Sequence, residues 1–126
     1  MAWIKHTILA VPTFRYVYMT EEKIYVTPRC PIRTTLGLVG GKWKLIVLQQ
    51  LLRNEELRLS QLKRLIPDIS EKMLIQELKT LVMNNLINRK DYGEVPPRVG
   101  YSITEKGRNI EPLLKEMIVF AEKYEH

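Results

Sequence analysis

The chain has 126 residues, of which 45% are hydrophobic and 27% charged, with 20 Lys and Arg against 14 Asp and Glu, a formal net charge of +6. This length suits a single domain with its own core, and the positive balance favours polyanionic partners. The single cysteine excludes an internal disulfide framework and favours a cytoplasmic location, and no apolar run approaches the roughly 18–20 residues that cross a membrane.

Residues that carry most enzymatic chemistry are scarce. The two histidines, His6 and His126, lie near the ends of the sequence. No carboxylate pair, nucleophile–base pair or cluster of metal ligands has a suitable spacing. The sequence therefore predicts neither an enzyme nor a protein that needs a metal or another cofactor.

Residues 1–29 differ in composition from the rest of the chain. They are rich in aromatic and β-branched side chains, as in Lys23 to Thr27, and are interrupted by Pro12. This pattern is typical of a strand or hairpin, although an extended arm of uncertain order fits it too. Met19 begins a stretch that looks more like a native start than residues 1–18 do, so we hypothesise that residues 1–18 are dispensable.

Two helices are predicted at the start of the main domain, which we place at residues 30–126. Pro31 opens the first, Pro31 to Val39, because a proline in the first helical turn loses no hydrogen bond. Gly40 and Gly41 end it and form a tight turn. The second helix is predicted over Lys42 to Arg53, and its candidate core residues are Trp43, Ile46, Val47 and Leu51.

The next segment is typical of a helix-turn-helix unit. Leu57 to Leu59 is a candidate short strand, and Ser60 is expected to cap a helix from Ser60 to Leu65. Pro67 and Asp68 then form a turn into an amphipathic helix. Two helices joined by a tight turn, the second with a polar outer face, is the arrangement found in helix-turn-helix proteins.

The rest of the chain is organised around the helix from Ser70 to Asn84, which Ser70 is expected to cap. One face carries apolar residues at helical spacing: Leu74, Leu78, Leu81, Val82 and Leu86. The opposite face carries Lys72, Gln76, Lys79, Thr80 and Met83. Almost no acid interrupts this second face, which either faces solvent or lies in a DNA major groove.

Two strands and a long loop follow. Leu86 to Lys90 and Val99 to Ile103 are predicted to pair as antiparallel strands. The intervening segment, Asp91 to Arg98, is too long and too rich in proline for a tight hairpin turn, so we expect it to project as a wing. Thr104 is expected to cap the last helix, which extends to Tyr124.

The last helix is more apolar than one buried face requires. Pro112 is predicted to lie inside it and to bend it by removing a backbone hydrogen bond. The surplus apolar surface favours burial against a second subunit. The candidate interface residues are Leu113, Leu114, Met117, Ile118, Phe120, Ala121 and Tyr124. The predicted fold is mainly α with a small antiparallel β wing: a winged helix-turn-helix that forms a homodimer through its terminal helices.

Seven short motifs in the chain resemble those of one family. They are Cys30-Pro31, Gly40 to Trp43, Arg58 to Leu62, Ile69 to Leu74, Leu86 to Arg89, Glu94 to Val99 and Tyr101 to Gly107. In these motifs the segment from about Cys30 to Tyr124 resembles the HxlR family of transcription regulators of bacteria or archaea. The resemblance implies a winged helix-turn-helix homodimer, related in shape to MarR-type regulators, that binds double-stranded operator DNA and represses or activates nearby genes.

The resemblance also implies which residues contact DNA. Lys72 and Lys79 would contact phosphates, which position a protein without reading sequence. Gln76 is the candidate for a base contact, because its amide can pair with adenine through two hydrogen bonds. The remaining candidates are Ser70, Met73, Thr80, Arg89, Lys90 and Arg98. Three of them have other interpretations: Ser70 as a cap only, Met73 as packing, and Arg98 as a solvated residue or the partner of Glu94.

Cys30 has two interpretations. In some members of the family a cysteine before this proline senses oxidants or electrophiles, and the position after Arg29 and ahead of a helix favours a thiolate. Most single cysteines, however, are small buried hydrophobic residues.

The sequence as a whole predicts a sequence-specific transcription regulator, more often a repressor than an activator, acting as a homodimer on a pseudo-palindromic operator. A small-molecule or oxidant effector remains open. The alternative is a winged-helix module that binds protein instead of DNA, since this fold serves both uses.

Overall fold

The computed structural model describes residues 27–125, which belong to two units, one ending at Gly37 and the other beginning at Leu38. Helix α2 (Pro31–Val39) has the predicted bounds and crosses this boundary. The expectations for a strand or arm before residue 27, and for the dispensability of residues 1–18, lie outside the described residues. The two units are therefore considered separately.

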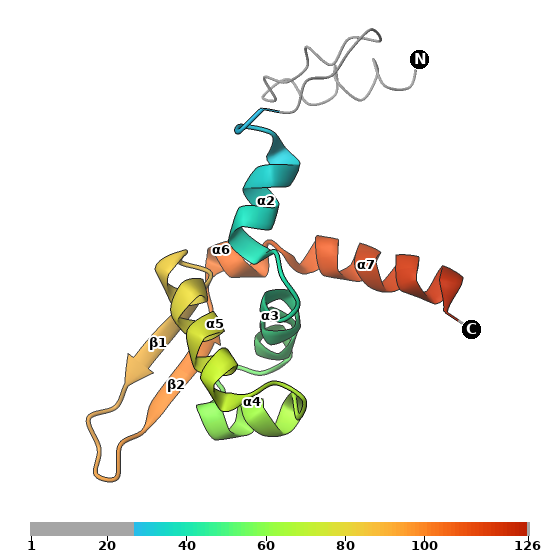
Figure 1. Ribbon diagram of the computed structural model, residues 1–126. Coiled ribbons are helices and arrows are strands. Elements are labelled where there is room, and N and C mark those ends of the chain that lie inside the picture. The colour runs from blue at the N-terminus through green and yellow to red at the C-terminus, as the bar shows by residue number, and fades with distance from the viewer. Residues whose placement is uncertain (1–26, 126) are drawn as a thin grey trace, which may run out of the picture. The chain divides into compact units, whose positions relative to one another are not determined.

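The second unit is a winged helix-turn-helix (Figure 1). Its elements in chain order are α3 (Lys44–Arg53), α4 (Leu59–Leu65), α5 (Glu71–Met83), β1 (Ile87–Asp91), β2 (Val99–Ile103), α6 (Glu105–Arg108) and α7 (Glu111–Tyr124). The two strands pair antiparallel, with Ile87 opposite Ile103 and Asp91 opposite Val99. The predicted fold class, mainly α with a two-stranded wing, is confirmed.

The core of the second unit lies where α3, α4 and α5 meet. Its fully buried residues include Val47, Leu48, Leu51, Leu62, Leu74, Leu78 and Leu81. Burial of each such leucine stabilises the fold by about 1.5–3 kcal/mol. Ile46, expected in the core, is 37% exposed instead. Val47, Leu48 and Leu51 lie on the buried face of α3. Successive residues are about 100° apart around a helix, which places Ile46 on the other face.

The start of α4 differs from the prediction. Arg58, not Ser60, is the capping residue, and its backbone N–H donates to Oε1 of Gln61 at 2.8 Å. The expected strand at Leu57 to Leu59 is reduced to a single bridge, in which Leu57 and Tyr101 exchange backbone hydrogen bonds of 2.9 and 2.8 Å. The Gln61 side chain thus satisfies the backbone donor of Arg58, and Ser60 is the second residue inside the helix.

The predicted last helix is two helices. Thr104 does cap a helix, since its Oγ1 accepts from the N–H of Gly107 at 2.9 Å, but that helix ends at Arg108. A new helix starts after Ile110, with Pro112 in its first turn. Pro112 therefore opens α7 and does not bend a longer helix, in keeping with the preference of proline for the first helical turn. None of the helices within residues 27–125 is long and apolar enough to cross a membrane.

Candidate nucleic-acid interface

The beginning of α5 is fixed by Ser70. Its Oγ accepts the N–H of Met73 at 3.1 Å, which confirms the predicted cap. Glu71 follows in the first turn, where the positive end of the helix dipole favours an acid. Because Ser70 is exposed, its hydroxyl stays open to solvent as well. A phosphate contact by Ser70 stays a prediction.

The inner face of α5 is held by the core and by one ion pair. Leu74, Leu78 and Leu81 are each 1% exposed or less. Between them Glu77 points inward, and Nζ of Lys44 on α3 donates to its Oε1 at 3.0 Å. Sequence reasoning missed this pair. The sequence did contain a signal for it, because Glu77 lies three residues after Leu74 and four before Leu81. This spacing places an acid on the apolar face of the helix, where it needs a partner.

The outer face of α5 is basic and polar. Lys72, Gln76 and Lys79 are exposed, as predicted, and Thr80 is half-buried with its hydroxyl donating to the carbonyl of Gln76 at 3.2 Å. Met73 is 38% exposed. In α5, every residue of which is described, the only exposed acid is Glu71. The face therefore presents two cations and an amide with no opposing charge beyond the first turn.

The end of α5 is attached to the segment that follows the wing. Asn85 adopts a left-handed conformation with φ of 61°, which ends the helix. The hydroxyl of Thr104 donates to the carbonyls of Asn85 and Leu86, at 2.7 and 3.0 Å, and Nζ of Lys106 donates to the carbonyl of Asn84 at 3.0 Å. These bonds fix the orientation of α5 relative to β2.

The loop between β1 and β2 forms the predicted wing. The N–H of Tyr92 donates to the carbonyl of Arg98 at 3.0 Å, which closes the base of the loop. At the turn, Oδ1 of Asp91 accepts the N–H of Gly93 at 2.9 Å, and Gly93 has a positive φ of 66°. Arg89 and Lys90 are exposed on β1, at the base of the wing.

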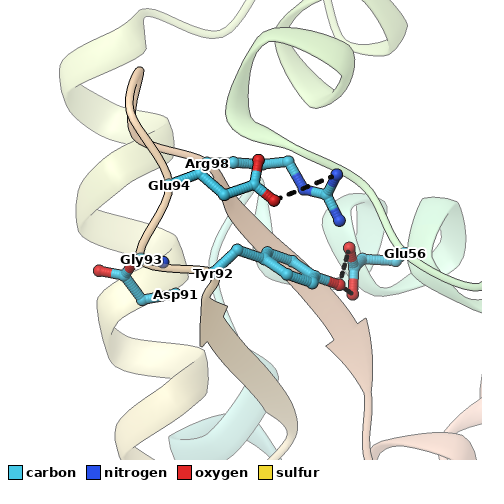
Figure 2. A network of polar contacts seen from close by, with 6 residues as sticks. All are labelled: Glu56, Asp91, Tyr92, Gly93, Glu94 and Arg98. Atoms are coloured by element: carbon cyan, nitrogen blue, oxygen red, sulfur yellow. Dashed lines mark hydrogen bonds and ion pairs between the residues drawn. The ribbon is translucent and has the colours of Figure 1, made fainter.

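Arg98 lies over the ring of Tyr92 (Figure 2), with its guanidinium carbon 3.8 Å from the ring centroid. Its Nη1 is also 3.8 Å from Oε2 of Glu94. The alternative interpretation of Arg98 as the partner of Glu94 is therefore present in the structure as a long ion pair. The pKa of Arg98 is raised above its ordinary value. The contact with the Tyr92 side chain is the largest cause, and the carboxylates of Glu94 and Glu56 add smaller contributions. The Arg98 side chain is still 41% exposed and stays accessible to DNA.

A groove of about 540 Å³ separates α5 from the two strands. Apolar side chains form most of its lining: Leu59, Ile75, Leu78, Val82, Met83, Val99 and Tyr101. Lys79 of α5 and Arg89 of β1 also line it. Two of the candidate DNA contacts, which are ten positions apart in the sequence, are thus brought to one groove.

Six of the seven candidate interface residues are exposed on α7. Phe120 is 67% and Tyr124 74% exposed, and their rings contact each other with centroids 5.2 Å apart and planes tilted by 47°. Val119, which sequence reasoning missed, is 45% exposed. Leu114 differs from the others: it is 9% exposed, on a helix that packs against α3 of its own chain. Burial within the chain leaves Leu114 little surface for a partner.

Cys30 lies immediately before α2, in the first unit. It is half-buried, and its carbonyl accepts the N–H of Thr34 at 3.0 Å, so it starts the helix as expected. Within residues 27–125 no group of three or more His, Cys, Asp or Glu side chains could hold a metal ion.

The chain matches the family model of the HxlR-like helix-turn-helix over residues 38–126. The HTH-type transcriptional regulator YdeP of Bacillus subtilis is 42% identical over 95 residues, which are 75% of this chain and 73% of YdeP. The crystal structure of a MarR-family transcriptional regulator from Porphyromonas gingivalis W83 is similar with a TM-score of 0.74 and 42% identity, covering 81% of this chain and 99% of that one.

The redox regulator HypR in its oxidized form is similar with a TM-score of 0.71 and 35% identity, covering 77% of this chain and 99% of that one. The family match, the identity to HTH-type regulators and the winged fold agree with one another. The chain belongs to the HxlR-like helix-turn-helix family and is a transcriptional regulator with a helix-turn-helix DNA-binding domain.

Proposed function

We propose that this regulator is a homodimeric repressor that binds a pseudo-palindromic operator in the cytoplasm. In this proposal α5 enters the major groove, where Gln76 contacts a base edge and Lys72 and Lys79 contact phosphates. The wing places Arg98 at the narrow, electronegative minor groove. The other candidate contacts of the interface are Ser70, Met73, Thr80, Arg89 and Lys90.

The observation that carries this proposal is the composition of the outer face of α5. The core holds one side of the helix rigidly, while the other side exposes Lys72, Gln76 and Lys79 with Glu71 as its only exposed acid. A solvated face without a ligand would gain from alternating charges, because opposite charges four residues apart stabilise a helix. A face of cations and one amide suits a polyanion instead.

The proposed dimer rests on α7. Six exposed apolar side chains of this helix would be covered by a second copy: Leu113, Met117, Ile118, Val119, Phe120 and Tyr124. Ala121 lies among them and is also exposed. Two copies related by a two-fold axis present two α5 helices, so the half-sites should lie about one helical turn apart, about 34–36 Å.

The proposal is tested by the salt dependence of duplex binding. The purified full chain is titrated against a labelled duplex, obtained by selection from a random pool, at several salt concentrations. Each phosphate contact adds about −0.9 to the slope of log K against log salt, so we expect a steep negative slope and a selected sequence with two-fold symmetry. A flat slope and no sequence enrichment would instead favour the protein-binding alternative.

The proposal includes an oxidant response through Cys30. Cys30 is the only cysteine of the chain. It lies immediately before α2 and is half-buried. HypR, a redox regulator, has a similar structure. Because the chain has no second cysteine, any disulfide must join two subunits or an external thiol.

The oxidant response is tested by measuring DNA affinity before and after treatment with diamide. The proposal predicts a change in affinity that is reversed by dithiothreitol, together with a covalent dimer or a mass shift at Cys30. The Cys30→Ser variant is the control and should not respond. If the native chain binds DNA with the same affinity before and after diamide treatment, the oxidant response is contradicted. The DNA-binding part of the proposal would still stand.

A further inference from the structure

Glu56 links the turn between α3 and α4 to the base of the wing. The hydroxyl of Tyr92 donates to its carboxylate, whose two oxygens are each 2.7 Å away. Figure 2 shows the Tyr92 ring reaching from the start of the wing loop to this carboxylate. Both residues are half-buried, so water competes less for this bond than for one on the open surface.

The backbone around Glu56 leaves this side chain little freedom. Its neighbour Leu57 is joined to Tyr101 of β2 by two backbone hydrogen bonds. Gly100, which precedes Tyr101, is buried, and a Cβ added there would overlap the carboxyl group of Glu56. Glycine at position 100 therefore leaves the space through which the Glu56 side chain reaches Tyr92.

Tyr92 in turn supports Arg98. The guanidinium carbon of Arg98 lies 3.8 Å from the centre of the Tyr92 ring, and the two residues also share the backbone hydrogen bond that closes the wing. The distance to Glu94, 3.8 Å, is at the outer limit of an ion pair. Tyr92 is therefore the main support of the Arg98 side chain. The hydrogen bond to Glu56 holds the Tyr92 hydroxyl, and Nζ of Lys90 lies over the same ring, 4.7 Å from its centre.

We infer that Glu56 is a positioning residue for the wing, which acts through Tyr92 to set where Arg98 is presented to DNA. The inference rests on the proposed contact between the wing and DNA. The negative charge of Glu56 by itself repels phosphates and lowers affinity. Its hydrogen bond to Tyr92 has the opposite effect, because a side chain held in place loses less entropy when it binds.

Two substitutions separate the charge from the hydrogen bond. Tyr92→Phe removes the hydroxyl without changing the net charge, and Glu56→Gln removes the charge but keeps an oxygen that can accept from Tyr92. By fluorescence anisotropy on the selected duplex, we expect Tyr92→Phe to weaken binding by about two- to tenfold, which is the cost of ordering one flexible side chain on binding. Glu56→Gln should bind at least as tightly as the native chain.

The role of Arg98 is tested by combining substitutions. In an Arg98→Ala background, Tyr92→Phe should cause no further loss of affinity, and the salt slope should stay that of Arg98→Ala alone. A general structural defect would instead lower affinity equally in both backgrounds. Gly100→Ala offers an independent route, because its Cβ would overlap the Glu56 carboxyl group, and it should reproduce the effect of Tyr92→Phe on affinity.

The outcomes separate this inference from the proposed function. If Arg98→Ala weakens binding while Tyr92→Phe and Gly100→Ala bind like the native chain, the role of Glu56 is overturned and the DNA-binding proposal stands. An equal loss from Tyr92→Phe with and without Arg98 also overturns it. If neither Arg98→Ala nor substitutions on α5 affect duplex binding, the proposed function itself fails and the inference fails with it.

Discussion

The helices α5 and α7 are both amphipathic and have 13 and 14 residues, but only α5 has its apolar face covered by its own chain. Leu74, Leu78 and Leu81 of α5 are buried almost completely. On α7 only Leu114 is buried, and Phe120 and Tyr124 are more than half exposed. The covered apolar face of α5 organises the fold, whereas the exposed apolar face of α7 is the surface that we propose a second copy covers. The two helices thus have different roles within one small domain.

The largest effect is expected on the covered side of α5. Replacing Glu77 by Ala removes one partner of the nearly buried pair with Lys44 and leaves a charge without a counterion. Loss of one member of a buried pair costs about 3–5 kcal/mol of the free energy of unfolding. Urea denaturation followed by circular dichroism measures it.

The matched variant is Glu77→Gln, which retains an acceptor for Lys44 and should lose less stability than Glu77→Ala. Equal stability of the native chain and Glu77→Ala would show that the ion pair does not hold α5 and would weaken the contrast with α7.

The next effect is expected on the bare side of α7. Phe120→Asp places a charge in the proposed interface, where loss of a central aromatic anchor costs about 2–4 kcal/mol and raises the dimer dissociation constant by at least about 30-fold. Sedimentation equilibrium should find a monomer that no longer binds the selected duplex tightly. Val95→Asp is the control for the sedimentation measurement alone, since Val95 is 96% exposed but lies on the wing, which the proposal places against DNA. A Phe120→Asp chain that sediments as a dimer would place the interface elsewhere.

A smaller effect is expected at the start of α5. Ser70→Ala removes the hydroxyl that caps the helix and should lower the free energy of unfolding by about 1 kcal/mol. Ser60→Ala is a close control, because Ser60 lies inside α4 and does not cap it. Comparison of the two by denaturant unfolding checks the assignment. A larger loss for Ser60→Ala than for Ser70→Ala would contradict it.

Local patterns predicted the parts of the fold that local chemistry determines. The bounds of α2 and β2, the Ser70 cap and the inner face of α5 follow from Pro31, from alternation along the strand and from leucines at helical spacing. The prediction of a single last helix was wrong because Ile110 extends the apolar pattern of α7 back to the break at Asn109. The position of Pro112 was the signal that a new helix starts there.

Contacts between distant parts of the chain could not be predicted. Glu56 and Tyr92 are 36 positions apart, and no periodicity connects them. The space that Gly100 leaves for Glu56 exists only when β2 lies beside the turn before α4. The pair of Lys44 with Glu77 is of the same kind, although an acid on an apolar face did indicate that a partner was needed.

On α5, Gln76 is proposed to contact a base and Lys79 a phosphate, and one paired measurement tests these two roles most directly. The affinities of Gln76→Ala and Lys79→Ala are measured by anisotropy for the selected duplex and for an unrelated duplex over a range of salt. Gln76→Ala should lose about 1–3 kcal/mol on the selected duplex alone. Lys79→Ala should weaken both duplexes and reduce the salt slope by about one unit. Unchanged affinity of both variants for the selected duplex would contradict the assignment of α5 as the helix that reads DNA.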